Sequence, residues 1–197
     1  RLVGAAEYDV LPPGRLFAWG YFEGVADREP RLRIGQVGEL AFPAAPTDGG
    51  LYLAGACPPM RSRHAFLAER ERSFDAGLRR WRELADLLAG ARRVGPIRVA
   101  ARWHSYFREA SGPGWALVGD AGNFKDPSPA QGISDALRHA EHLAGLIADG
   151  GLEGWWAWRD ADARPMHLLA AALGAGDEAP PPVATQIIRD LAAEPAG

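Results

Sequence analysis

Residues 115–143 read WALVGDAGNFKDPSPAQGISDALRHAEHL, and the interpretation of the whole chain starts from them. A short apolar strand over 115–118 leads to Gly119, which lets another group approach the backbone closely. Asp120 follows as a hydrogen-bond acceptor at the carboxyl end of a strand, where α/β proteins bind ligands. After a proline-rich turn, a helix begins near Gly132, and its N-terminus favours an anionic partner. The stretch therefore predicts a site for a ligand that carries both hydroxyls and negative charge.

The same stretch resembles the second flavin-contacting motif of the group A FAD-dependent monooxygenases, the superfamily similar to para-hydroxybenzoate hydroxylase. The likeness rests on GDAG at 119–122, KDP at 125–127 and AQGISDA at 130–136. In that family the aspartate that matches Asp120 bonds the ribityl chain of FAD, the matching proline lies near the isoalloxazine ring, and the matching helix start faces the pyrimidine edge. The resemblance therefore implies a cofactor-binding set: Gly119, Asp120, Pro127, Gly132 and Ile133.

The resemblance also implies an oxidoreductase that uses FAD and NAD(P)H to hydroxylate an aromatic or polyketide-like small molecule. The opening RLVGA at 1–5 is compatible with the same family. The chain has no GxGxxG, the motif with which the family's N-terminal segment holds the ADP half of FAD. We therefore expect a fragment whose partner is that N-terminal FAD-binding segment, with weak or absent FAD binding and little activity by itself.

Two alternatives stay open beside the monooxygenase. A related flavin reductase of the geranylgeranyl-reductase type would show a long apolar tunnel in place of a compact aromatic pocket. A non-catalytic module for a small ligand would keep the pocket without affinity for flavin. The sequence identifies no side-chain acid or base, so the catalytic residues stay unknown.

Outward from the motif, the apolar spacing predicts an α+β fold: a mostly antiparallel sheet packed by helices, with a helical C-terminal tail. Alternating or aromatic-rich runs between glycine and proline breaks predict strands at 15–23, 31–42, 51–57, 96–107 and 115–118. Helical spacing predicts helices at 63–88, divided near Gly77, and at 130–148, 153–173 and 183–193. We expect one domain over 1–150, with the sheet and the flavin motif, and the helical tail over 151–197.

Aromatic residues on the predicted strands are candidates for a substrate pocket. In the family this sheet forms the floor of the pocket over the flavin, and an aromatic substrate suits aromatic neighbours. The candidates are Trp19, Tyr21, Trp103 and Tyr106, with His104 beside them. The competing interpretation is that these side chains belong to the hydrophobic core.

Other polar residues near the motif have simpler interpretations. Lys125 is expected to be a solvated loop charge, and Asp135 is expected to cap the helix or to pair locally. His139 and His142 are three residues apart on a helix and are expected to be exposed, because no third metal ligand of suitable spacing is evident. The tryptophans after the motif are expected to pack between helices: Trp155, Trp156 and Trp158.

Composition limits the remaining classes. The chain has 197 residues, a formal net charge of −3 and a sequence pI of about 6.0, which give no basic footprint for nucleic acid. Cys57 is the single cysteine, so neither a disulfide within the chain nor a cysteine-based zinc site is possible. No run approaches the ~20 apolar residues of a membrane helix. We expect a cytoplasmic protein without a resident metal or a membrane contact.

Overall fold

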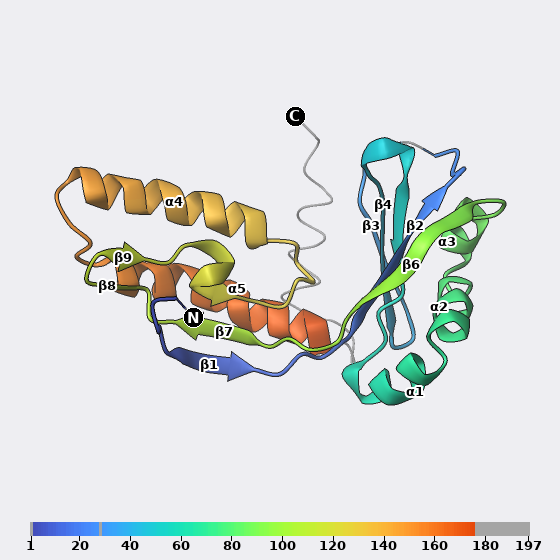
Figure 1. The fold of residues 1–197 in the computed structure, drawn as a ribbon, viewed down its shortest axis with the longest axis horizontal. Helices are drawn as coiled ribbons and strands as arrows, with labels where there is room; N and C mark the ends of the chain where they lie inside the picture. The colour runs from blue at the N-terminus through green and yellow to red at the C-terminus, as the bar shows by residue number, and fades with distance from the viewer. Residues whose placement is uncertain (1, 28, 176–197) are drawn as a thin grey trace. The chain divides into compact units, whose positions relative to one another are not determined.

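The computed structural model describes residues 2–27 and 29–175, and it confirms the α+β class with antiparallel sheets (Figure 1). The chain forms two compact units. The sheet unit is Gly14–Arg102, and the groove unit combines Arg1–Pro13 with Trp103–Gly197. The helix after residue 150 packs in the groove unit, and the domain boundary expected at that residue stays a prediction.

The sheet unit contains a five-stranded antiparallel sheet in the order β3-β4-β5-β2-β6. Turn-forming glycines separate its short strands, as the sequence predicts. The strands are β2 (Phe17–Glu23), β3 (Arg33–Val37), β4 (Leu40–Pro46), β5 (Tyr52–Gly55) and β6 (Arg92–Ala100). Two short 3₁₀ turns, η1 (Asp48–Gly50) and η2 (Met60–Ser62), flank β5.

Three short helices cover one face of this sheet: α1 (Arg63–Ala68), α2 (Arg70–Leu78) and α3 (Arg82–Leu87). Side chains alternate along β2, so that Ala18 and Phe22 point into the core against Phe74 and Leu84 of the helices. Phe74 and Leu84 are fully buried, and burial of each such side chain contributes about 1.5–3 kcal/mol. The core of the sheet unit therefore lies between the sheet and its helices.

The groove unit is built on a three-stranded antiparallel sheet in the order β1-β7-β10, with a small hairpin beside it. Its strands are β1 (Glu7–Leu11), β7 (Ser105–Arg108), β8 (Ser111–Gly112), β9 (Trp115–Ala116) and β10 (Asn123–Phe124). A 3₁₀ turn, η3 (Gly119–Ala121), leads on towards the helix α4 (Gly132–Ala148), and α5 (Trp155–Ala175) follows.

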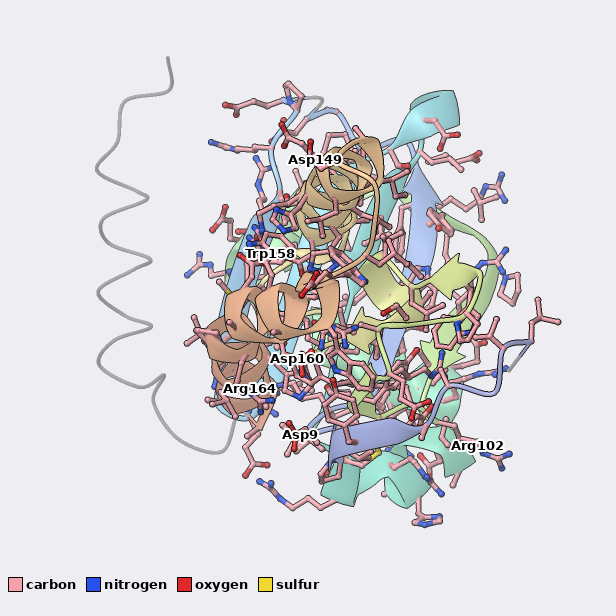
Figure 2. The ribbon with its side chains drawn as sticks, turned by 90° about the vertical axis from the view of Figure 1, so that its left-hand side faces the viewer. Asp9, Arg102, Asp149, Trp158, Asp160 and Arg164 are labelled. Carbon is pink, nitrogen blue, oxygen red and sulfur yellow. The ribbon has the colours of Figure 1, made fainter. Side chains whose placement is uncertain are left out.

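Helix α5 is fixed to the strands by a buried guanidinium. Arg159 is fully buried and donates to the carbonyl of Gly122 at 2.7 Å and to the carbonyl of Arg108 at 2.6 Å. One turn away, Arg164 of α5 and Asp9 of β1 point toward one another and form an ion pair (Figure 2). These contacts place α5 against the edge of the motif that the sequence singles out.

The structure confirms most of the predicted elements and corrects several limits. The predicted strand at 96–107 is two strands, β6 and β7, and the helical region at 63–88 is three helices. The strand β1 was not predicted. The helix expected at 183–193 lies outside the described residues. None of the helices that the structure describes has the length and apolar character needed to cross a membrane.

Candidate functional site

A groove of about 710 Å³ lies in the groove unit, between η3, the loop after β10 and the first turns of α4. All five residues that the resemblance assigns to the cofactor line it: Gly119, Asp120, Pro127, Gly132 and Ile133. The structure therefore brings together, in one hollow, residues up to 14 positions apart in the sequence. Their contact with a cofactor stays a prediction.

Gly119 is a position at which only glycine fits. Its φ is +53°, in the left-handed region that residues with a Cβ rarely adopt. A Cβ built there would lie 2.8 Å from the Cβ of Ala136 and 3.3 Å from its Cα. The absence of a side chain thus lets η3 lie directly against the second turn of α4.

Asp120 presents its carboxylate beside the start of α4. A Cβ built on Gly132 would lie 3.4 Å from Asp120 Oδ1, so the carboxylate sits over the first residue of the helix. The residue is exposed towards the groove, yet partial desolvation there raises the pKa of its carboxyl; the charge of Lys125 opposes the shift and that of Asp135 adds to it. Tyr106 Oη donates to the Asp120 carbonyl at 2.9 Å and holds its backbone.

The N-terminus of α4 faces the groove without a side-chain cap. Gln131 occupies the N-cap position and makes no capping hydrogen bond, so the first-turn N–H groups receive no acceptor from it. Ala130, just before it, has a φ of +56°, which is unusual for a residue other than glycine. An uncapped helix start with its positive dipole end favours an anionic or carbonyl-bearing ligand.

Lys125 is not the solvated loop charge that the sequence led us to expect. Its side chain is 4% exposed and forms a buried ion pair with Asp135, whose side chain is 5% exposed. Asp135 also accepts from Arg138 at 2.9 Å, and Arg138 reaches Asp162 of α5 at 2.8 Å. The local pairing expected for Asp135 is confirmed, and through it the loop, α4 and α5 are tied together behind the groove.

His139 is buried, whereas the sequence led us to expect two exposed helix histidines. It is 1% exposed, and its Nδ1 lies 3.2 Å from the Gly119 amide nitrogen. His142 is half-buried and stacks on Trp158, which projects from α5 (Figure 2), with ring centroids 3.7 Å apart. Within the described part of the chain, no group of three His, Cys, Asp or Glu residues is placed to hold a metal ion.

Two of the three tryptophans of α5 pack between helices as expected, and the third, Trp156, is exposed. Trp155 is fully buried, and its Nε1 donates to the Ala110 carbonyl at 3.1 Å. Trp158 is half-buried against the histidines of α4, as expected for helix packing. Trp156 is 38% exposed, and its Nε1 donates to Tyr8 Oη at 2.8 Å.

The candidate pocket aromatics fall in both units. Trp103 and Tyr106 belong to the groove unit, and each lies 5.9 Å from Phe124, which lines the groove. Trp19 and Tyr21 belong to the sheet unit and are half-buried on the face of β2 opposite the core. None of the four is part of the buried core, and their contact with a substrate stays a prediction.

Helix α4 also carries an exposed apolar stripe. Ile133 is 80% exposed, Leu137 68% and Ile147 59%, and Ala140 and Ala144 between them are exposed too. The face that α4 turns inward contains Asp135 and His139 instead. No described residue covers this stripe, which begins at the groove and runs along the helix.

The sequence matches no family model and no curated protein. Solved structures match closely in fold. The flavin-dependent halogenase CmlS has a TM-score of 0.67 at 21% identity over 98% of this chain. CabE, an aromatic hydroxylase from angucycline biosynthesis, has a TM-score of 0.60 at 16% identity over 96% of this chain. Klebsiella pneumoniae HpxO, solved as a variant complexed with FAD, has 0.59 at 16% identity over 91%.

The chain has the fold of the flavin-dependent halogenases and aromatic hydroxylases. It spans 40%, 39% and 50% of the lengths of these three structures, respectively. The fold agrees with the α+β class predicted from the sequence. At these identities the likeness establishes the fold and leaves the activity to the site itself.

The groove of this flavin-enzyme fold has the chemistry that a flavin needs. The exposed carboxylate of Asp120 suits a ribityl hydroxyl, and the uncapped start of α4 suits the ring edge on which reduced flavin carries negative charge. Gly119 lets η3 pack against α4 and so keeps Asp120 beside the helix start, and Ile133 offers an exposed apolar surface. The residues present therefore fit the cofactor.

Proposed function

We propose that the chain is the flavin- and substrate-contacting part of an FAD-dependent monooxygenase that hydroxylates an aromatic or polyketide-like small molecule with NAD(P)H as reductant. One observation carries the proposal: the five residues of the flavin-like motif line a single groove, at the uncapped start of α4, in a flavin-enzyme fold. A binding module without flavin does not require all of these features together.

A bound flavin would supply the redox and oxygen-activating chemistry, and the residues of this chain would bind and orient it. Asp120 would accept a hydrogen bond from a ribityl hydroxyl, while Tyr106 holds the Asp120 backbone. First-turn N–H groups of α4 would stabilise negative charge on the ring edge. Ile133 would exclude water from the ring, because its side chain is apolar and lines the groove.

The exposed stripe of α4 supports a partner for this site. Water-facing apolar surface on a helix whose inward face is polar indicates that another body covers the stripe. The stripe starts at Ile133 and Leu137, which also line the groove, so the covering body would reach the same ligand. We assign this role to an FAD-binding segment that provides the adenosine and pyrophosphate contacts.

The substrate side is proposed from the aromatic cluster. Trp103 and Tyr106 each lie 5.9 Å from Phe124, which lines the groove, and their rings offer flat apolar surface to an aromatic substrate. The pocket role that the resemblance implies for Trp19 and Tyr21 of the sheet unit stays a prediction; their face of β2 is free of the helices that form the core. No side-chain acid or base is assigned.

A flavin titration tests the proposal at its centre. Titration of the chain with FAD and with FMN, followed by flavin fluorescence, should give weak and similar affinities, because both share the ribityl and ring portions that the groove contacts. Asp120→Ala should weaken either affinity about tenfold or more, as expected for loss of a hydrogen bond to a charged group. The matched control is Asp149→Ala, an exposed aspartate at the far end of α4 (Figure 2) that should leave the affinity unchanged.

Three outcomes would contradict the proposal. Micromolar or tighter binding with strong preference for FAD over FMN would mean that the chain holds a complete FAD site by itself. No flavin binding, even with an FAD-binding segment supplied, would favour a ligand-binding module. With that segment supplied, a product that gains halogen from added chloride or bromide in place of oxygen would replace hydroxylation by halogenation.

A further inference from the structure

His139 is a buried polar side chain of α4 that accepts a hydrogen bond from the backbone of η3. Its Nδ1 lies 3.2 Å from the Gly119 amide nitrogen, which can only donate a hydrogen bond. Nδ1 must therefore carry a lone pair, and the neutral ring must carry its proton on Nε2. The backbone of η3 thus dictates the tautomer of a side chain on α4.

The surroundings of the second ring nitrogen agree with this tautomer. His139 Nε2 is buried, has no hydrogen-bond partner among the described residues, and lies 3.9 Å from Asp162 Oδ2. A proton on Nε2 would point towards that carboxylate, which Arg138 holds at 2.8 Å. Trp155 and Trp158 of α5 meet the ring edge-on, with centroids 5.9 Å and 6.1 Å away, and fix its plane.

The hydrogen bond from the Gly119 amide to His139 fixes the backbone beside Asp120, the carboxylate of the groove. Gly119 precedes Asp120, so His139 holds the backbone on one side of Asp120, while Tyr106 Oη holds the Asp120 carbonyl on the other. Between these two bonds the backbone keeps the left-handed turn at Gly119. The direction of the Asp120 carboxylate is set by that turn.

We propose that His139 is a positioning residue for the flavin groove: in its neutral, Nε2-protonated form it holds the Gly119–Asp120 turn, and protonation of the ring releases that turn. The flavin part of this inference rests on the proposed function, whereas the hydrogen bond and its release do not. Protonation places a proton on Nδ1, which then faces the Gly119 N–H donor to donor. The hydrogen bond cannot persist in that state.

Burial, more than the charges around it, keeps His139 neutral at neutral pH. Burial lowers the pKa of the imidazole, and Lys125 from the loop and Arg138 from α4 lower it further. Asp135 of α4 and Asp162 of α5 raise it, less strongly than burial lowers it. The turn is therefore held above the ordinary histidine pKa of 6.5 and is released only in acid.

Nitrogen NMR of the unmodified chain tests the hydrogen bond without any flavin. We expect the ring ¹⁵N shifts of His139 to report the Nε2–H tautomer, and the Gly119 amide shift to follow His139 during an acid titration, with a midpoint below 6.5. An Nδ1–H tautomer, or a Gly119 amide that does not respond when His139 titrates, would overturn the inference. Because this experiment uses no variant, it does not depend on a substitution that folds.

A pair of variants then tests the positioning role. In His139→Asn the side-chain oxygen takes the place of Nδ1 and keeps an acceptor for Gly119, whereas in His139→Gln the amide reaches the place of Nε2 and the acceptor is lost. His142→Asn, on the same helix, is the control for removal of an imidazole. We expect His139→Gln to weaken FAD binding about fivefold, the effect of one hydrogen bond, and His139→Asn to stay within about twofold of the unmodified chain.

The two proposals fail in distinguishable ways. Equal flavin affinities for His139→Asn and His139→Gln, with both variants folded, would refute the positioning role. If the NMR titration behaves as expected but the chain never binds flavin, even with an FAD-binding segment supplied, the proposed function fails and the His139–Gly119 coupling stands.

Discussion

The substitution Gly119→Ala tests the packing on which the groove rests. Two costs add. The left-handed φ of +53° costs a residue with a Cβ about 1–2 kcal/mol. The new Cβ would lie 2.8 Å from that of Ala136 and 3.3 Å from its Cα, so α4 must shift, and such overpacking costs about 1–3 kcal/mol. The smaller entropy of the unfolded alanine chain offsets about 0.4–1 kcal/mol. The expected loss in unfolding free energy is therefore about 1–5 kcal/mol.

Two further glycines separate these terms. Gly114 has a φ of +79° but open space around it, so Gly114→Ala carries the backbone cost alone. Gly145 lies inside α4, also with open space, and Gly145→Ala should stabilise the chain by up to about 1 kcal/mol through helix propensity. Urea unfolding of all three variants, at unchanged m-value, gives the comparison. The reasoning is refuted if Gly119→Ala lowers the unfolding free energy no more than Gly114→Ala does. The close contact between η3 and α4 would then add nothing to the effect of the substitution.

Three further predictions concern the charges and the surface of the groove unit. Lys125→Met should destabilise the chain by about 3–5 kcal/mol in urea unfolding, because it leaves the buried carboxylate of Asp135 without its main partner. An effect below about 1 kcal/mol would mean that the ion pair is solvated. Burial lowers the folded pKa of both His139 and His167, so the unfolded chain binds more protons and the unfolding free energy should fall as pH drops below about 6.5; a flat pH profile of urea unfolding would contradict this. Leu137→Ser should leave the stability unchanged within about 0.5 kcal/mol, because the side chain is 68% exposed.

Local patterns were enough to predict the elements of the sheet unit, but not where its helices break. The region 63–88 has continuous helical spacing, yet the chain leaves the helix at Glu69 and again at Trp81. The Trp81 ring lies against Gly35 of β3, where a built Cβ would be only 2.9 Å from it, and 5.7 Å from the ring of Phe42. Trp81 has extended backbone angles, which let its ring pack on the sheet. Tertiary packing here overrides helix propensity, and no local pattern records it.

The candidate groove was predictable from the sequence, whereas the charges behind it were not. Gly119, Asp120 and the start of α4 are local features, and a strand–turn–helix connection brings them together. Lys125 and His139 were assigned to solvent because charged and polar residues are rarely buried. Their burial depends on partners ten and twenty residues away, Asp135 and Gly119, and such pairings become visible only when the chain is folded.

Helix α4 shows most directly how sequence and structure differ, and Leu137→Ser turns that difference into a measurement. An apolar helix stripe such as that of Ile133, Leu137 and Ile147 ordinarily faces a core, in which case removing the leucine side chain would cost about 2–5 kcal/mol. The structure turns Asp135 inward and leaves the stripe in water, so the same substitution should cost almost nothing.

Leu84→Ser, at a fully buried leucine of α3, shows what a packed site costs in the same chain. If Leu137→Ser proves as costly as Leu84→Ser in the dilute chain, the stripe is covered already and needs no further partner. If only Leu84→Ser is costly, the stability of the chain does not depend on the stripe. Loss of binding to an added FAD-binding segment in Leu137→Ser would then assign the stripe to that partner.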